Sequence, residues 1–86
     1  MTPPSVHASH PAVVARLKRA EGHLRSVTAM IQAGQPCLDI AQQLHAVEKA
    51  VANAKRVLIH DHMDHCLDTK GSDTDRAELK AISRYL

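Results

Sequence analysis

Two apolar stripes with the same heptad-like spacing constrain the fold of this chain more than any other feature. Along each stripe, apolar residues recur at alternating intervals of four and three residues, which is typical of one face of an α-helix. The stripes comprise Val13, Leu17, Ala20, Leu24, Val27 and Ile31, then Ile40, Leu44, Val47, Val51, Ala54 and Leu58. Gly34 and Pro36 stand between them and are typical of a helix end. The sequence therefore predicts a helical hairpin.

The ends of the two helices are marked by residues that favour helix termini. Ser9 is a candidate N-cap for the first helix, and Pro11 is tolerated in its first turn. Residues 1–9 before it are expected to form a mobile arm. The second helix is predicted to begin at Pro36 or Cys37 and to run to about Lys70, before Gly71.

A short third helix is expected at the end of the chain, within one domain spanning residues 1–86. Its candidate caps are Ser72 and Thr74. Its partial apolar face consists of Ala77, Leu79, Ile82 and Leu86.

Composition supports an all-α fold and a thin core. Aromatic residues make up 1% of the 86 residues, which excludes strand-rich sandwiches and aromatic RNA-binding sheets. No apolar run approaches the roughly 18 residues of a membrane span, and no segment resembles a signal peptide. Two amphipathic helices cannot bury both stripes alone. We therefore expect two hairpins to pair into a four-helix bundle.

Two cysteines and one histidine extend the second stripe at both ends. Cys37 precedes Ile40 by three residues, His62 follows Leu58 by four, and Cys66 follows His62 by four. A continuous helix places Cys37 and His62 roughly 37 Å apart, so the three cannot meet in one protomer. If two second helices pack antiparallel about a two-fold axis near residue 50, Cys37 of one lies beside His62 and Cys66 of the other. The pattern predicts two metal sites per dimer.

Other interpretations of these residues remain open. A cysteine on an apolar stripe is more often a small core residue, and a disulfide would need an oxidant that the cytosol withholds. His60 and His65 are expected to be surface or supporting residues, and His23 and His45 ordinary surface histidines. His7 and His10 stand at the end of the arm, and His7 is the better candidate for a fourth ligand.

The basic residues gather in the first two-thirds of the chain. Residues 1–60 carry seven Lys and Arg against three acids, whereas residues 61–86 carry four against six. The candidates for nucleic-acid contact are Arg16, Lys18, Arg19, Lys49, Lys55 and Arg56. An oligomer that repeats them on one face would bind phosphates, and a solvated helix face is the alternative. No phosphate-binding glycine loop, serine elbow or HExxH motif indicates an enzyme.

Three segments resemble the CsoR/RcnR family of metal-sensing repressors: RLKRAEGHL (16–24), CLDIAQQLHAVEKAV (37–51) and AKRVLIHDHMDHC (54–66). Cys37, His62 and Cys66 match the thiolate, imidazole and thiolate ligand positions of that family. The resemblance implies a three-helix protomer and an antiparallel helical-hairpin dimer. It implies that two dimers pair into a flat tetramer, a dimer of dimers, with metal sites between protomers. It further implies a cytoplasmic repressor whose metal-free tetramer binds operator DNA, with Arg16 matching a DNA-contacting arginine. Asn53 stands where some copper sensors have a basic residue, a role for which Lys49, Lys55 and Arg56 are candidates.

The resemblance favours Ni(II) or Co(II) as the effector, with Cu(I) as the alternative. The arm SVHASHP resembles the histidine-bearing arms of the nickel and cobalt branch, although Ser5 occupies the aligned ligand position and His7 is the nearest histidine. Two thiolates and one imidazole also suit Cu(I) in a trigonal site. A metal-buffering bundle without a DNA role is an alternative of another class, and a helical interaction module with core thiols is a third.

Overall fold

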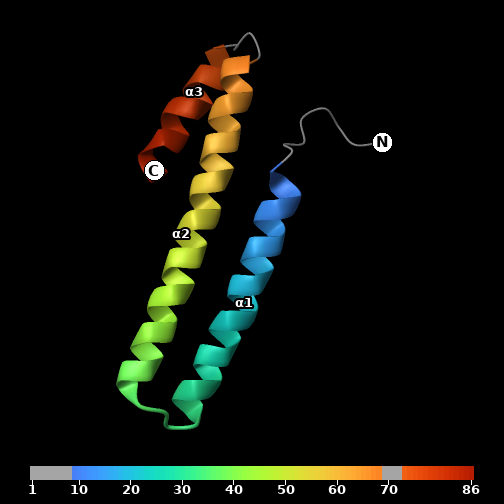
Figure 1. Ribbon diagram of the computed structural model, residues 1–86. Coiled ribbons are helices and arrows are strands. Elements are labelled where there is room, and N and C mark those ends of the chain that lie inside the picture. The colour runs from blue at the N-terminus through green and yellow to red at the C-terminus, as the bar shows by residue number, and fades with distance from the viewer. Residues whose placement is uncertain (1–8, 69–72) are drawn as a thin grey trace.

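The protein folds as three α-helices, as the stripes predict (Figure 1). The computed structural model describes residues 9–68 and 73–86, and the side chains of residues 9–64 and 76–86. The elements are α1 (His10–Gln32), α2 (Cys37–Asp68), α3 (Asp73–Ile82) and a terminal 3₁₀ turn at Ser83–Tyr85. Strands are absent from the described ranges, so the all-α prediction is confirmed. None of the helices described is both long and apolar enough to cross a membrane.

The first helix begins where the sequence predicts, but Ser9 does not cap it through its side chain. Pro11 lies in the first turn of α1, and the Ser9 carbonyl accepts a 2.9 Å hydrogen bond from the Val13 amide. The backbone of Ser9 is helical, with φ −79° and ψ −16°, and its hydroxyl makes no capping hydrogen bond. An N-cap side chain needs an extended backbone to reach the free amides, which explains the wrong prediction.

A glycine in the left-handed region closes α1 and turns the chain into α2. Gly34 has a φ of 71°. Its amide donates to the Ile31 carbonyl at 3.1 Å, and the Gln35 amide donates to the Met30 carbonyl at 3.0 Å. This pair of hydrogen bonds is the Schellman arrangement, which satisfies carbonyls left free at a helix end. The turn lets α2 begin directly at Cys37, as expected.

The start of α3 differs from the predicted one. Helix α2 is described as far as Asp68, and α3 includes Asp73, so Thr74 lies inside α3 and is not its cap. An acidic residue at a helix N-terminus is favoured by the helix dipole, which is consistent with the earlier start. The predicted break at Gly71 and the candidate cap Ser72 lie outside the described residues, as do residues 1–8 of the arm.

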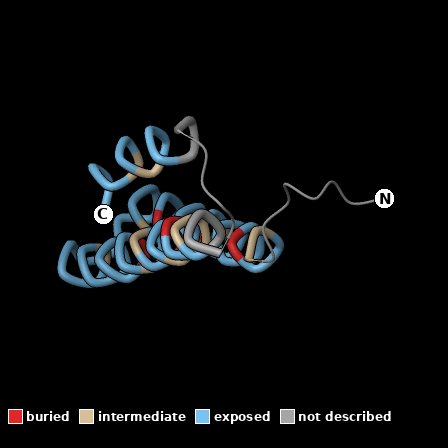
Figure 2. Tube along the Cα trace, turned by 90° about the horizontal axis from the view of Figure 1, so that it is seen from above, coloured by how far each residue is buried: buried red, intermediate tan, exposed pale blue. Residues whose placement is uncertain are grey.

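The hairpin is one helix thick. Helices α1 and α2 run antiparallel in a single layer, and α3 lies to one side of that layer, next to the end of α2 (Figures 1 and 2). The molecule measures 54 × 31 × 14 Å, and its radius of gyration is 17.2 Å, against about 12 Å for a compact domain of this length. Its accessible surface of 6780 Å² exceeds the roughly 5000 Å² expected for a compact monomer of 9.4 kDa.

Only alternate residues of each stripe are buried within the chain. The buried members are Val13, Ala20, Val27, Val47 and Ala54. The residues between them are between 40% and 57% exposed: Leu17, Leu24, Ile31, Leu44, Val51 and Leu58. Each stripe therefore supplies one line to the hairpin seam and leaves a second line of large aliphatic side chains uncovered. This split arises because a single layer of two helices covers only one side of each stripe.

The two glycines of α1 and its turn should respond oppositely to the same substitution. Gly34→Ala is expected to lower the free energy of unfolding by about 1 kcal/mol, because a side chain disfavours a positive φ. Gly22→Ala should raise it by about 0.5–1 kcal/mol, because Gly22 is inside α1 and an added Cβ meets nothing within 4 Å. Urea unfolding at a fixed chain concentration measures both. A loss at Gly22 as large as that at Gly34 would contradict the open space found there.

Candidate functional site

Cys37 is the first residue of α2 and lies at the turn end of the hairpin. Its thiol is free and exposed. Because the Cys37 side chain is exposed, its thiol is accessible to a ligand or to a second chain.

His62 lies near the opposite end of α2, beside α3. Its side chain is 16% exposed, and its Nε2 is 3.9 Å from Oε1 of Glu78 on α3. Metal-binding imidazoles commonly have a carboxylate at one ring nitrogen, because the carboxylate fixes the ring while the other nitrogen faces the ion. Nothing in the sequence pattern marks Glu78 for this place, because the contact depends on how the chain folds back between α2 and α3.

The remaining predicted ligands are only partly located. Cys66 lies within α2, one turn after His62, but its side chain lies outside the described residues. His7 lies outside the described residues altogether. The part of the chain that the structure describes contains no group of three His, Cys, Asp or Glu side chains able to hold a metal ion.

The unbroken length of α2 separates the candidate ligands. Cys37 and His62 are 25 residues apart in one continuous helix, which corresponds to roughly 37 Å. The turn end and the α3 end of the hairpin lie at opposite ends of the molecule (Figure 1). Cys37 and His62 of one chain therefore do not meet.

The candidate ligands continue the uncovered apolar line of α2. Cys37, Leu44, Val51 and Leu58 follow one another at intervals of seven residues, and His62 lies one turn beyond Leu58. Residues spaced by seven or four lie on the same side of a helix. The exposed half of the second stripe thus has a thiol at one end and an imidazole at the other.

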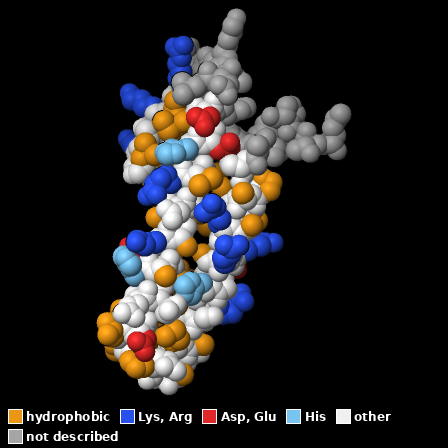
Figure 3. All heavy atoms as spheres, in the orientation of Figure 1, with side chains coloured by type: hydrophobic (Ala, Val, Ile, Leu, Met, Phe, Trp, Pro, Cys, Tyr) orange, Lys and Arg blue, Asp and Glu red, His pale blue; other side chains and the backbone are white. Residues whose placement is uncertain are grey.

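The six predicted DNA-contact residues are all exposed, but they do not form one cluster. On the face seen in Figure 3, Lys and Arg side chains gather over the middle of α1 and α2, with histidines among them. Arg16 and Arg19 share one side of α1, whereas Lys18 points away from Arg16, because residues two apart face opposite sides of a helix. Lys49 and Arg56 are two helical turns apart on α2.

Arg56 is held on this helix by a neighbour. Its Nη1 donates a 2.9 Å hydrogen bond to Oδ1 of Asn53, one turn earlier. Asn53, which stands where some copper sensors have a basic residue, therefore binds the basic side chain of Arg56 from the next turn. The sequence marks Asn53 only as a departure from the family pattern, and its contact with Arg56 follows from i, i+3 spacing on a helix.

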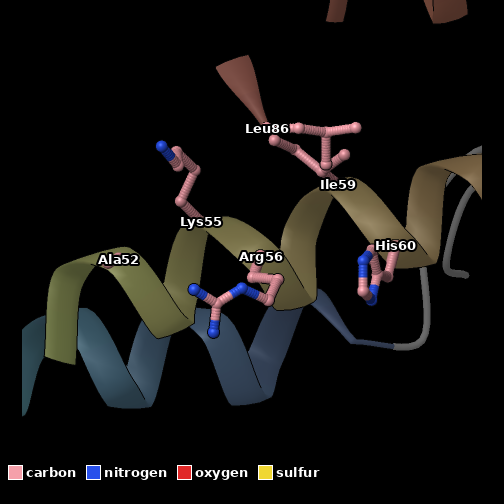
Figure 4. Close-up of a pocket in the computed structure, with 6 residues that line it drawn as sticks. All are labelled: Ala52, Lys55, Arg56, Ile59, His60 and Leu86. Carbon is pink, nitrogen blue, oxygen red and sulfur yellow. The ribbon is translucent and has the colours of Figure 1, made fainter. Parts of the chain in front are cut away.

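Lys55 belongs to a different part of the surface, beside the C-terminal segment. A cavity of about 340 Å³ lies between α2 and the end of the chain, and Figure 4 shows it. The lining residues are Ala52, Lys55, Arg56, Ile59, His60 and Leu86. Leu86 lies beside Ile59, which is 4% exposed, while the Lys55 side chain extends away from Arg56 and His60. The cationic groups around the cavity do not converge on one point.

A polar contact between His23 and Gln43 joins the two helices and was not expected from the sequence. His23 of α1 is half-buried, and its Nε2 lies 2.6 Å from Oε1 of Gln43 on α2. Because the amide oxygen accepts, the Nε2–H of the imidazole is the donor. The sequence predicts His23 as an ordinary surface histidine. Its spacing of three from Ala20 and four from Val27, both buried, is the signal that places it at the edge of the seam.

Comparisons with known proteins show that this chain is similar to metal-sensing repressors. The family model described as metal-sensitive transcriptional repressor matches residues 9–86. The chain is 40% identical over 52 residues to the copper-sensing transcriptional repressor CsoR of Bacillus subtilis (strain 168), a match that covers 60% of this chain and 52% of that protein. It is 38% identical over 55 residues to the CsoR of Mycobacterium ulcerans, covering 64% of this chain and 47% of the relative. The chain thus spans about half the length of these relatives.

Two further matches cover larger shares of both this chain and the matched protein. The copper-sensing transcriptional repressor RicR of Mycobacterium tuberculosis (strain ATCC 25618 / H37Rv) is 35% identical over 72 residues, which cover 77% of this chain and 75% of RicR. The solved structure of the nickel-responsive transcriptional regulator InrS superposes with a TM-score of 0.78 and 32% sequence identity, covering 98% of this chain and all of that one. The chain therefore belongs to the CsoR/RcnR family of metal-sensitive transcriptional repressors, whose members are regulators and not enzymes.

Proposed function

We propose that this protein is a cytoplasmic repressor that binds operator DNA as a metal-free tetramer and releases it when Ni(II) or Co(II) binds, so that a metal-efflux gene is expressed. One observation carries the proposal. The uncovered apolar line of α2 begins at Cys37 and leads to His62 and Cys66, so the surface that needs a partner also bears the candidate ligands.

A second copy of the hairpin is the partner that fits this surface. Six large aliphatic side chains are 40% to 57% exposed on one side of a layer that is one helix thick. Burying the exposed half of each would contribute about 1 kcal/mol per side chain. Two hairpins packed face to face give a four-helix bundle, and two such dimers give the tetramer.

The two-fold axis of this dimer would bring the ligands together. With two α2 helices antiparallel about a point near residue 50, Cys37 of one protomer lies beside His62 and Cys66 of its partner. Thiols and an imidazole are suitable donors for Ni(II), Co(II) and Cu(I). Glu78, whose Oε1 is 3.9 Å from Nε2 of His62, would help to orient the imidazole ring at the site. A bound ion would supply a cross-link between the two ends of neighbouring protomers.

Ni(II) or Co(II) is the proposed effector because the arm offers a further nitrogen ligand in His7 and the fold matches the nickel-responsive InrS along its length. Cu(I) is the second candidate. It is favoured by the copper-sensing relatives and by the three-residue thiol and imidazole set, which needs no ligand from the arm. A metal buffer without a DNA role is disfavoured by the match to a repressor family over residues 9–86.

The operator would bind to the exposed basic residues of the first two helices, Arg16, Lys18, Arg19, Lys49, Lys55 and Arg56. A tetramer repeats them four times, which compensates for the small net charge of +2 per chain. A bound ion that joins Cys37 to the far end of the partner's α2 would change the relative positions of these basic residues in the tetramer. A coupling free energy of about 1–3 kcal/mol between metal binding and DNA binding would suffice for a switch.

Metal-dependent release of DNA is the direct test of this function. The metal-free protein should shift a labelled duplex selected from a random library, and the metal should reverse the shift. Cys37→Ala should bind the duplex normally and stay bound when the metal is added, because the cross-link cannot form. Anaerobic titration with Ni(II), Co(II), Cu(I) and Zn(II), with absorption spectra, ranks the effectors. A Ni(II) spectrum unchanged in His7→Ala would remove the arm from the site, and normal release in Cys37→Ala would refute the ligand set.

Mixed dimers test whether the site lies between protomers. Neither Cys37→Ala nor His62→Ala should bind metal tightly alone. After unfolding and refolding together, half of the dimers are mixed, and each mixed dimer keeps one intact site, formed by Cys37 of one protomer and His62 of the other. Metal capacity should therefore recover to roughly a quarter of the wild-type value. If the mixture binds no more metal than either variant alone, the inter-protomer arrangement is wrong.

A charge on the uncovered apolar face should prevent assembly. Val51→Lys places a cation on the exposed line of α2 near the proposed axis, where two copies would meet in the dimer. Sedimentation should show monomers, and metal binding should weaken together with assembly. Arg25→Lys on α1, which keeps the charge of an exposed residue, is the control. A tetramer that persists in Val51→Lys would show that another surface mediates assembly.

A further inference from the structure

The hydrogen bond between His23 and Gln43 lies on the side of the hairpin that carries Arg16 and Arg19. His23 is two helical turns from Arg16 and one turn from Arg19, so the three share one side of α1. Gln43 approaches His23 from α2 on that same side. The exposed apolar residues Leu17 and Leu24 flank the other side of the seam. The hairpin therefore has one apolar face and one face with cations and a bridged polar pair.

The bond fixes which groups of Gln43 remain available to a ligand. Nε2–H of His23 donates to Oε1, so the oxygen of the planar amide is turned toward α1. The amide nitrogen of Gln43 keeps its two N–H donors, and the Gln43 side chain is exposed. A donor held in place by a 2.6 Å hydrogen bond loses less rotational freedom on binding than a free glutamine does. The pair is therefore a preorganised donor for an acceptor outside the protein.

Charge and shape indicate phosphate oxygens as that acceptor. Arg16 and Arg19 supply two cations on the side of α1 that carries His23, and Lys49 and the Asn53-bound Arg56 add cations farther round α2. The two helices lie side by side in one layer. The major groove is about 12 Å wide and admits one helix, so a face two helices wide lies across the backbone rather than inside the groove. Side chains at the seam of such a face meet phosphates, not base edges.

We propose that Gln43, positioned by His23, donates a hydrogen bond to a DNA phosphate on the side of the hairpin that carries Arg16 and Arg19. This inference rests on the proposed function, because it assigns a contact to the DNA complex of the repressor. Gln43 is a neutral residue, whereas the DNA-contact residues expected from the sequence are all Lys and Arg. Like every backbone contact, it would set the position of the protein on the duplex without reading the sequence.

The test separates a neutral phosphate contact from a cationic one. Gln43→Ala and His23→Ala are measured in the metal-free protein against the library-selected duplex and a scrambled duplex of equal length, over a range of salt concentrations. Gln43→Ala should bind both duplexes about tenfold more weakly, because a hydrogen bond to a charged acceptor is lost. His23→Ala should weaken binding to both duplexes by a smaller factor, because Gln43 keeps its donors but loses its fixed orientation. The slope of affinity against salt should stay unchanged, since no cation is removed. Arg19→Ala should instead lower that slope by about one per contact.

Control variants exclude a purely structural role. His45→Ala removes a histidine that is two residues from Gln43 and faces the opposite side of α2, so DNA affinity should not change. Gln43→Glu keeps an oxygen that accepts from His23 but replaces the amide donors with a carboxylate, so the hairpin should stay as stable while DNA binding falls further than in Gln43→Ala. Circular dichroism and urea unfolding measure stability.

Three outcomes would overturn the inference. Loss of affinity for the selected duplex alone would show that the pair reads bases. Unchanged affinity in Gln43→Ala, together with lower stability, would show a hairpin brace only. A wild-type protein that shifts neither duplex would refute the proposed DNA-binding function itself. Normal binding by the wild-type protein together with normal binding by Gln43→Ala would refute only the inference about Gln43.

Discussion

Much of the structure depends on one constraint, which is that two amphipathic helices in a single layer can cover only half of their apolar surface. Val13, Ala20, Val27, Val47 and Ala54 fill the seam between α1 and α2, and the intervening Leu, Ile and Val residues stay 40% to 57% exposed. A layer 14 Å thick has no second layer of its own to cover them. The proposed dimer would cover these residues with a second copy of the hairpin, which matches the first in length and apolar pattern.

In the proposed dimer, the same constraint links assembly to metal sensing. The exposed line of α2 is bounded by Cys37 at the turn and by His62 beside α3, and the unbroken helix holds these ends apart. With Cys37 and His62 as the proposed ligands, one chain would hold no complete site. Metal binding would then depend on quaternary structure, and geometry would couple the ion to the relative placement of the protomers.

The opposite face of the hairpin has a different chemistry. Arg16 and Arg19 lie on the same side of α1 as His23, which is bonded to Gln43, and Asn53 accepts a hydrogen bond from Arg56. Hydrogen bonds between side chains at the surface contribute little to stability on their own. In the proposed DNA complex, they would place donors before binding. The proposal thus assigns assembly and metal binding to one face of the hairpin and DNA contact to the other, while α3 lies to one side of the layer (Figure 2).

Sequence by itself determined the three helices, the turn at Gly34 and the line that joins Cys37, His62 and Cys66, because helical periodicity and glycine's access to positive φ act locally. It failed at Ser9, whose helical backbone keeps its hydroxyl from capping, and it did not mark Glu78 or the His23–Gln43 bond. Those contacts join residues on different helices. Which members of a stripe are buried, and which side chains meet across the seam, were decided only by tertiary structure, because the rotation of each packed helix about its axis is set by contacts with its neighbour.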